Sequence, residues 1–394
     1  MKVLMLGWEF PPFSSGGLGT HCYNITKALS AQGARVTFLM PGCSDDLKSD
    51  SVRIIQAGKG RVVKMGVAIR PYLPSLPIAV KTDSKSENNK VYGEGFFQDV
   101  QKYTDLALQS SRDLDCDVIH CHDWMTFPAG IRVKEEKKKP LVVTVHSTEF
   151  DRTGSLCPNP WISDIEWQGM YHADRVIAVS KYMKDQLVEK YSVPEDKIDV
   201  VHNSINSEEY SGERLSFGLD QKVVLFLGRL TLQKGPDYFL KAAKKVLEKD
   251  KNVRFVVVGT GDMLPQLIDM SINMGISSDV IFTGFQESIK EYYSMADLYV
   301  MPSVSEPFGI TALEAMASGA PVIVSKQSGV REAVKHKLSV DFWDVDRLAS
   351  KMLGVLSYDC VRDEMRKNGH REVRRMSWND AAKETVSVYS KTIN

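Results

Sequence analysis

The string from Glu306 to Pro321 combines acids and glycines in a pattern that can do chemistry. Glu306 precedes a predicted helix, and Glu314 lies inside that helix. Phe308-Gly309-Ile310-Thr311 should form the helix N-terminus, where unpaired N–H groups and the helix dipole favour a phosphate. One turn later, the Glu314 carboxylate can accept hydrogen bonds from the hydroxyls of a ribose. A surface acid would explain either glutamate alone, but not the whole string.

Two loops that follow predicted strands carry features that suit the same kind of ligand. The loop after Val223–Leu227 holds Arg229 and Lys234, and two cations at the carboxyl end of a strand can bind a diphosphate. They can also neutralise a leaving group, as magnesium does in other enzymes. Gly16 and Gly17 precede a predicted helix and let the backbone approach a ligand closely. A solvated basic loop and a tight structural turn are the plain alternatives.

The string His120-Cys121-His122-Asp123 is where the sequence suggests a metal site. His120 and His122 would share one face of a strand while Cys121 points away. The sequence shows no second ligand cluster that would complete the site. The six cysteines are scattered and form no Cys-x-x-Cys pair. We therefore expect neither a metal ion nor a resident cofactor.

Composition narrows the class of protein. The chain has 394 residues, of which 43% are hydrophobic and 25% charged, as in a soluble protein of two domains. Lysine plus arginine and aspartate plus glutamate both number 50, so no overall field favours nucleic acid. No apolar run reaches the roughly 18 residues of a membrane span. The basic run 134–139 fits a solvated helix face, with peripheral membrane contact as the minority alternative. A cytoplasmic location is expected.

Short β-branched runs alternate with helical patterns, which predicts parallel sheets built from βαβ units. A hydrophilic stretch at 206–219 separates two such series. We therefore predict an α/β protein with two Rossmann-like doubly wound domains, residues 1–208 and 209–376, that face one cleft. A further strand pair is expected at Val62–Leu73. The other predicted strands are Val3–Leu6, Arg35–Met40, Val118–His122, Leu141–His146, Arg175–Val179, Asp199–His202, Val223–Leu227, Arg254–Val258, Val280–Thr283, Leu298–Met301 and Val322–Ser325.

With these motifs in order, the chain resembles a known family. The string from Glu306 to Pro321 is similar to the paired-glutamate signature of retaining glycosyltransferases of the family that includes sucrose synthases and mannosyltransferases, and to the matching region of bacterial and archaeal glycogen synthases. The likeness extends over nearly the whole chain. The other segments that resemble the family are Gly16-Gly17, His120-Cys121-His122-Asp123-Trp124, Thr144-Val145-His146, Val201-His202-Asn203-Ser204-Ile205-Asn206, Gly228-Arg229 and Lys234-Gly235.

The resemblance implies the two-domain GT-B fold, with a last helix in residues 377–394 crossing back onto the first domain. It implies a nucleotide-diphosphate sugar as donor and a carbohydrate as acceptor, with transfer of a hexosyl unit, glucose above all. It further implies that configuration is retained, because the departing phosphate oxygen takes the acceptor's proton on the same face. Electrostatic stabilisation of the leaving group would then carry much of the rate without a catalytic metal.

Roles follow for individual residues by matching position. Arg229 and Lys234 would neutralise the diphosphate, and Glu306 and His146 would contact the donor sugar. Donor binding would also involve Gly16, Gly17, Gly309, Ile310 and Thr311 near the phosphates, Glu314 at the ribose and Phe285 near the base. Glu9, Asp123 and Trp124 would line the acceptor side.

Some positions depart from the pattern. Ser14-Ser15 stands where glycogen synthases have a lysine, and Lys335–Val340 replaces the usual Asn-Gly-x-Leu-Val segment. A glucan is therefore only one acceptor in view, beside a small sugar, a phosphosugar or a lipid-linked sugar. A sugar-nucleotide epimerase of the same fold and a non-catalytic sugar-nucleotide sensor are weaker alternatives.

Overall fold

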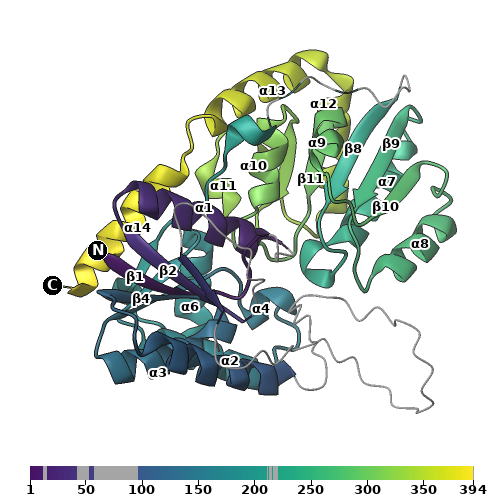
Figure 1. Cartoon of the computed structure of the whole chain (residues 1–394). Helices are drawn as coiled ribbons and strands as arrows, with labels where there is room; N and C mark the ends of the chain where they lie inside the picture. The colour runs from purple at the N-terminus through teal and green to yellow at the C-terminus, as the bar shows by residue number, and fades with distance from the viewer. Residues whose placement is uncertain are drawn as a thin grey trace, which may run out of the picture.

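The structure is a computed structural model, and it describes residues 1–11, 16–41, 53–56, 96–210, 212, 215 and 221–393. The strand pair predicted at Val62–Leu73 lies outside these residues. Within them the chain forms two parallel sheets flanked by helices (Figure 1). The α/β, doubly wound fold class predicted from the sequence is confirmed.

The first sheet has the strand order β3-β2-β1-β4-β5-β6-β7, and its printed strand pairs are all parallel. The central strands β4 and β5 are buried along their whole length, which explains their nearly continuous apolar sequences. The strands are β1 (Lys2–Leu6), β2 (Arg35–Met40), β3 (Arg53–Gln56), β4 (Val118–His122), β5 (Leu141–Val145), β6 (Arg175–Ala178) and β7 (Ile198–Val200), and the helices are α1 (Gly17–Ala31), α2 (Phe96–Ser111), α3 (Phe127–Lys137), α4 (Glu149–Arg152), α5 (Pro160–His172) and α6 (Lys181–Tyr191).

The second sheet repeats this plan with the order β10-β9-β8-β11-β12-β13, again in parallel. In both sheets the strand order reverses next to the first strand, beside β1 and beside β8. Ligands of doubly wound sheets bind at the carboxyl ends of the strands at this reversal. The elements are β8 (Lys222–Leu227), α7 (Pro236–Leu247), β9 (Val253–Val258), α8 (Leu264–Asn273), β10 (Val280–Gly284), α9 (Lys290–Met295), β11 (Leu298–Met301), α10 (Ile310–Ala317), β12 (Val322–Ser325), α11 (Val330–Ala333), β13 (Leu338–Val340), α12 (Val345–Ser357), α13 (Asp359–Val373) and α14 (Trp378–Ile393).

Two edge strands were not predicted. β3 has four residues and β13 has three, and each pairs with a single neighbouring strand. Runs this short carry too little alternation to be read from the sequence. The segment Lys335–Val340, noted as a departure from the family pattern, contains β13.

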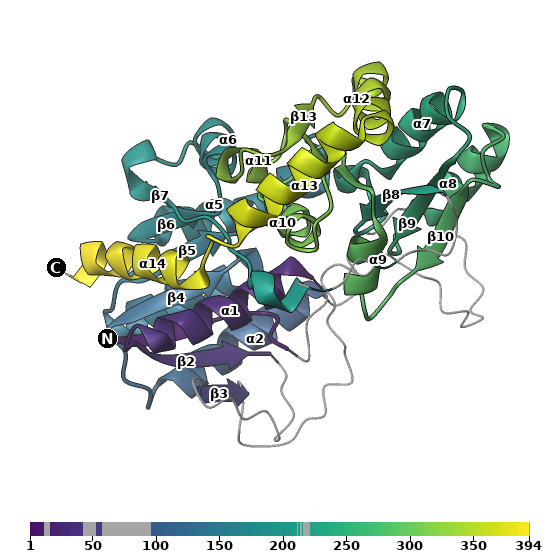
Figure 2. The ribbon, with the colours of Figure 1, turned by 90° about the horizontal axis from the view of Figure 1, so that it is seen from above.

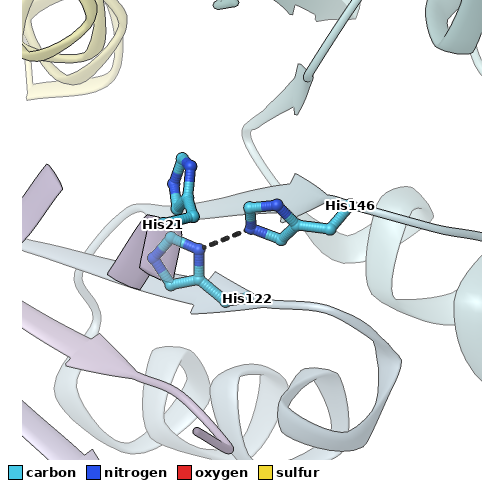
Figure 3. Close-up of side chains that lie close together, drawn as sticks. All are labelled: His21, His122 and His146. Carbon is cyan, nitrogen blue, oxygen red and sulfur yellow. Dashed lines mark hydrogen bonds between the residues drawn. The ribbon is translucent and has the colours of Figure 1, made fainter. Parts of the chain in front are cut away.

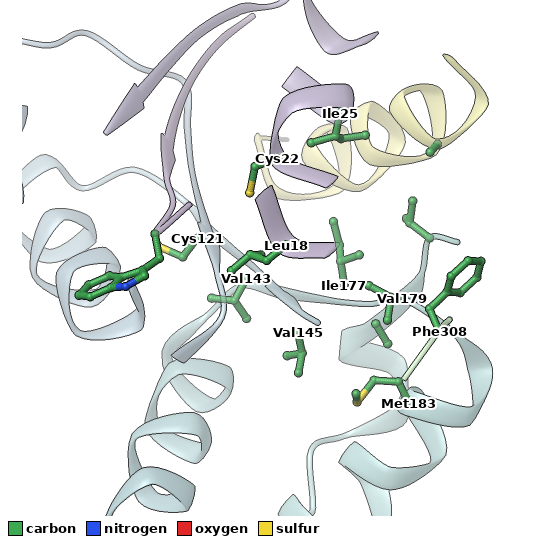
Figure 4. Close-up of a cluster of buried hydrophobic side chains, with 14 of the residues drawn as sticks. Leu18, Cys22, Ile25, Cys121, Val143, Val145, Ile177, Val179, Met183 and Phe308 are labelled. Atoms are coloured by element: carbon green, nitrogen blue, oxygen red, sulfur yellow. The ribbon is translucent and has the colours of Figure 1, made fainter. Parts of the chain in front are cut away.

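The carboxyl ends of the two sheets meet. Ser305 Oγ, in the loop after β11, donates a 2.5 Å hydrogen bond to the Asp151 carboxylate at the end of α4. Ser180 Oγ donates to the Pro307 carbonyl oxygen at 2.5 Å. Beside these polar contacts, Phe308 of the second half packs with Val179 and Met183 of the first (Figure 4). The loops that follow the strands of both sheets are therefore held against one another.

The last helix of the described chain returns to the first sheet. α14 lies beside α1 and β4, although the second sheet separates them in sequence (Figures 1 and 2). It buries Trp378, Ala382 and Tyr389. The Tyr389 hydroxyl lies 2.6 Å from His120 Nδ1, and His120 Nε2 lies 2.7 Å from Thr144 Oγ1. A buried polar chain thus joins α14 to the two central strands β4 and β5.

Replacing Tyr389 by phenylalanine tests this attachment. The change leaves His120 Nδ1 buried without its partner, which should lower the free energy of unfolding by about 1–3 kcal/mol. Urea denaturation measures the loss, with the exposed Tyr358→Phe as the matched control. Equal stability of the two variants would show that the hydroxyl contact contributes nothing.

Candidate functional site

An ion pair joins the two loops at the reversal point of the second sheet. Lys234 Nζ lies 2.6 Å from Glu306 Oε2, and the same carboxylate oxygen accepts a 3.3 Å hydrogen bond from Ser303 Oγ. Glu306 is buried, and 22% of the Lys234 side chain is exposed. Gly235 makes the approach possible, because its φ is 63° and a Cβ there would overlap the Pro302 carbonyl oxygen. The sequence placed both charged residues at the site, but not their pairing.

The N-terminus of α10 lies next to this pair. Gly309 precedes the helix with a φ of 105°, and a Cβ on it would lie 3.2 Å from Glu306 Cγ. Across the two halves of the molecule, a Cβ on Gly17 would lie 4.0 Å from Ile310 Cδ1. Gly16 and Gly17 begin α1 with exposed backbone. The structure therefore brings two helix N-termini from different sheets together, and such N-termini favour anions.

Glu314 points into a cage of tyrosines. Its Oε1 accepts a 2.8 Å hydrogen bond from the Tyr210 hydroxyl, and its Oε2 accepts one of 2.8 Å from Tyr293. Burial raises the pKa of this carboxyl, and the two hydroxyl donors oppose that rise. Thr311, one turn earlier on α10, accepts a 2.9 Å hydrogen bond from the Tyr299 hydroxyl. Sequence reasoning missed the tyrosines, because no local motif joins Tyr210 or the α9–β11 region to α10.

His146 lies just beyond β5, fixed by Asp123 at the end of β4. Its backbone N–H donates a 2.6 Å hydrogen bond to Asp123 Oδ1. Asp123 has a φ of 60° and is buried. Burial raises the pKa of its carboxyl to about 7, against the lowering effect of the His146 N–H. Asp123 therefore positions the loop that carries His146, a role that is distinct from the acceptor contact predicted for it.

Three histidine rings converge at this point. His122 Nδ1 lies 3.0 Å from His146 Nε2, and the His21 ring centroid lies 4.4 Å from that of His146 (Figure 3). Burial lowers the pKa of all three, that of His21 to about 4. Sequence reasoning missed His21, because a lone histidine inside a helix gives no signal. It also saw no second ligand group near His122, whereas the fold supplies two more imidazoles there.

Two residues expected on the acceptor side are buried in the structure. Trp124 is 2% exposed, and its ring lies 6.5 Å from that of Phe97. Glu9 is 4% exposed. The sugar-stacking surface expected of Trp124 is therefore covered in this structure, because the segment after β4 turns inward under α2 and α5.

The remaining predicted residues occupy different parts of the second sheet. Arg229 follows β8 in the same loop as Lys234 and is half-buried. Phe285 follows the edge strand β10 with 70% of its surface exposed. Arg229 thus lies at the strand reversal, whereas Phe285 lies two strands away from β8 along the sheet.

Two doubly wound parallel sheets whose carboxyl ends meet around a basic loop and a helix N-terminus define the GT-B class of glycosyltransferase folds. Sucrose-phosphate synthase from Thermosynechococcus elongatus has the same fold, with a TM-score of 0.78 and 20% identity over 99% of this chain and 98% of the other. HepE from Anabaena, solved in complex with UDP-glucose, gives a TM-score of 0.74 at 17% identity, covering 99% and 100% of the two chains.

Sequence comparison leads to the same class. Residues 209–372 match the family Glycosyl transferases group 1, and residues 2–198 match the family Starch synthase catalytic domain. An uncharacterized glycosyltransferase of Methanocaldococcus jannaschii is 35% identical over 99% of this chain and 98% of its own length. The glycogen synthase of Mycobacterium tuberculosis is 26% identical, covering 99% and 94%. The D-inositol 3-phosphate glycosyltransferase of Nocardia farcinica is 32% identical, covering 73% and 70%.

The chain belongs to the group 1 glycosyltransferases and carries an N-terminal half of the starch synthase type. Among the described residues, no helix combines the length and the apolar character needed to cross a membrane.

The buried histidines predict how stability depends on pH. Burial lowers the pKa of His120 to about 3, so the folded state does not bind the proton that the unfolded state takes up near pH 6.5. The folded state is therefore at its most stable, with respect to His120, above about pH 6.5, and the free energy of unfolding decreases as the pH falls below that value. From about pH 7.5 to about pH 5.5, the loss is about 1.4 kcal/mol for each such histidine. Asp123, with its raised pKa, acts in the opposite direction between about pH 4 and pH 7.

The measurement compares His120→Gln with the exposed His172→Gln by urea denaturation at both pH values. His120→Gln should lose about 1.4 kcal/mol less than the wild-type protein, because it removes one titrating group while Asp123 is common to both. His172→Gln should lose as much as the wild-type protein. Identical losses in all three proteins would contradict the assignment of His120 as a neutral buried group.

Proposed function

We propose that the protein is a retaining hexosyltransferase that transfers a sugar, glucose above all, from a nucleotide-diphosphate donor to a carbohydrate acceptor. The observation that carries the proposal is the Lys234–Glu306 pair beside the N-terminus of α10, with Gly17 approaching Ile310 from the other sheet. Cations, helix N-termini and a buried carboxylate meet there at the strand reversal. Such a site suits a ligand with a diphosphate at one end and hydroxyls at the other.

The diphosphate would bind to Lys234 and Arg229. An ammonium has three N–H donors, and Glu306 occupies one of those of Lys234, so phosphate oxygens can take the others. Backbone N–H groups of Gly17, Ile310 and Thr311 would add to the binding. Together these groups stabilise the negative charge that develops as the glycosidic bond to phosphate breaks, which is the largest electrostatic demand of the reaction.

Glu314 suits the ribose. Each of its carboxylate oxygens accepts one tyrosine hydroxyl in the structure, and each retains a further lone-pair direction for a ribose hydroxyl. Tyr210 belongs to the segment that connects the two halves, so this hydrogen bond couples the connecting segment to the nucleotide end of the site. Phe285, with its exposed ring, is the proposed neighbour of the base.

Glu306 and His146 would hold the donor sugar. The Glu306 carboxylate accepts hydrogen bonds from sugar hydroxyls, and its negative charge stabilises the positive charge that develops at the anomeric carbon. His146 is neutral because burial lowers its pKa, so it offers dipoles rather than a competing cation. The acceptor oxygen bonds to the anomeric carbon on the face that the phosphate leaves, and its proton passes to the departing phosphate oxygen. Configuration is thereby retained.

The comparisons indicate which substrates to try first. HepE is solved with UDP-glucose, and the mycobacterial relative is a glycogen synthase, so UDP-glucose and ADP-glucose are the first donors and a glucan is the first acceptor. The inositol phosphate relative supports a small phosphorylated acceptor as the alternative. A lipid-linked sugar stays beside it as an acceptor, whereas an epimerase activity and a purely sensory role rank lower, because Lys234, Glu306 and His146 are all present at the site.

A thermal-shift screen with ADP-, UDP- and GDP-sugars tests the donor. Saturation at about 100 times the dissociation constant should add about 2.7 kcal/mol to the free energy of unfolding. The donor that shifts the midpoint is then incubated with glucan or inositol phosphate, and NMR of the product reads the anomeric configuration. An inverted product, or no shift with any sugar nucleotide, would overturn the proposal.

Substitution of the ion pair tests the roles of its members. Lys234→Met should weaken donor binding roughly 10- to 150-fold, because it removes a charge-assisted hydrogen bond of about 1.5–3 kcal/mol. Glu306→Gln should lower kcat by about 100-fold or more, because it removes a charge that acts in the transition state. Lys241→Met is the matched control, since Lys241 pairs with Asp237 on the surface of α7 at 2.7 Å. Unchanged kinetics in both site variants would contradict these roles.

A further inference from the structure

The convergence of His21, His122 and His146 has a geometry that the sugar chemistry does not explain. One ring nitrogen from each of the three residues lies within 4.8 Å of the others. The rings come from α1, from the end of β4 and from just beyond β5 (Figure 3). The donor-binding role proposed for His146 needs neither of its two imidazole neighbours as a ligand.

The hydrogen bonds orient one ring as a metal ligand requires. His21 Nδ1 lies 2.8 Å from Asn203 Oδ1, and an amide oxygen can only accept, so Nδ1 carries the proton. The lone pair of His21 is then on Nε2. Metal-binding histidines commonly donate their second ring N–H to an acceptor of this kind, which fixes the tautomer and the ring orientation.

The second ring has a nitrogen that no protein group uses. His122 is fully buried, and its Nε2 has no hydrogen-bond partner among the described residues. An unpaired buried nitrogen costs about 1–3 kcal/mol. His122 Nδ1 and His146 Nε2 face each other across 3.0 Å and share one proton, so an ion that binds both nitrogens leaves the proton of His122 on its Nε2.

The third consideration is where the fixed charges of the site lie. The cations of the site, Lys234 and Arg229, belong to the other sheet.

We propose that His21, His122 and His146 bind one divalent transition-metal ion, with Zn²⁺ as the best match. Three imidazoles are a ligand set that zinc prefers and magnesium does not. In tetrahedral zinc with Zn–N bonds of about 2.0–2.1 Å, two ligand nitrogens lie roughly 3.3 Å apart. The 3.0 Å separation of His122 Nδ1 and His146 Nε2 is close to this value. Metal binding at these two nitrogens breaks the hydrogen bond between them, and each neutral ring then carries its proton on its other nitrogen, His122 on Nε2 and His146 on Nδ1.

Metal binding has a consequence that rests on the proposed function. The expected reaction needs no metal, and His146 is expected to contact the donor sugar. A zinc ion that engages the His146 ring withdraws it from the sugar, so the metal acts as an inhibitor rather than as a cofactor. The sequence analysis predicted no metal ion, because the three histidines are distant in the chain and only the fold brings them together.

Equilibrium dialysis of the full chain against Zn²⁺, with metal analysis, tests binding directly. Zinc also binds thiols, and Cys157 and Cys360 are exposed, so the parent protein carries serine at both positions and at Cys43, which lies outside the described residues. The parent should bind one zinc per chain. Co²⁺ in place of Zn²⁺ should give the intense visible absorption of a tetrahedral ion with nitrogen ligands.

The variants separate ligation from packing. His122→Gln should abolish the site, and Asn203→Ala should weaken zinc binding 10- to 100-fold by freeing the His21 ring. His172→Gln is the exposed control and should bind as the parent does. Circular dichroism verifies that each variant is folded. Absence of zinc binding in the parent, or equal binding in Asn203→Ala, His122→Gln and the control, overturns the site.

Activity provides a separate reading. Zinc should inhibit sugar transfer, and a chelator should restore it. Stoichiometric zinc binding that leaves transfer unchanged would uphold the metal site and overturn the sugar contact of His146. Failure to bind zinc, with normal transfer, would overturn the metal site and leave the proposed function intact.

Discussion

The Lys234 ammonium and the Glu306 carboxylate lie 2.6 Å apart on two loops that follow central strands of the second sheet. Both charges are largely removed from water, and either alone would be costly there. Their pairing therefore requires the two loops to approach, which in turn requires the positive φ of Gly235 and of Gly309. The N-terminus of α10 follows directly from that loop. The direction of its free N–H groups thus depends on the same contact.

The loop that holds Glu306 is also the place where the two halves of the molecule join. Ser305, its neighbour in sequence, donates to Asp151, and the Tyr182 hydroxyl lies 3.1 Å from Ser305 Oγ. His146 begins the segment that joins β5 to α4, and Asp151 lies in α4 itself. One short segment therefore links the imidazole of the first sheet to the carboxylate of the second. A movement of one half relative to the other would therefore change the positions of His146 and Glu306 relative to each other.

A second set of buried polar groups lies behind His146. His120 contacts Tyr389 of α14, and His122 contacts His146. Because these rings are buried and neutral, their hydrogen bonds are strong and specific in a medium of low dielectric constant. Helix α14 thus helps to hold the strands that carry the site, although α14 is remote from those strands in sequence.

The α/β class, the doubly wound halves and the loops that hold Glu306, Lys234, Gly17 and His146 could be predicted from the sequence, because strand periodicity and loop motifs are local properties. The sequence did not reveal the short edge strands β3 and β13, whose few residues carry little pattern. Which groups meet depends on the packing of distant segments, as in the tyrosines around Glu314, the inward turn of Trp124 and the convergence of His21 on His146. These contacts join residues far apart in the chain, and no local pattern encodes their distance in space.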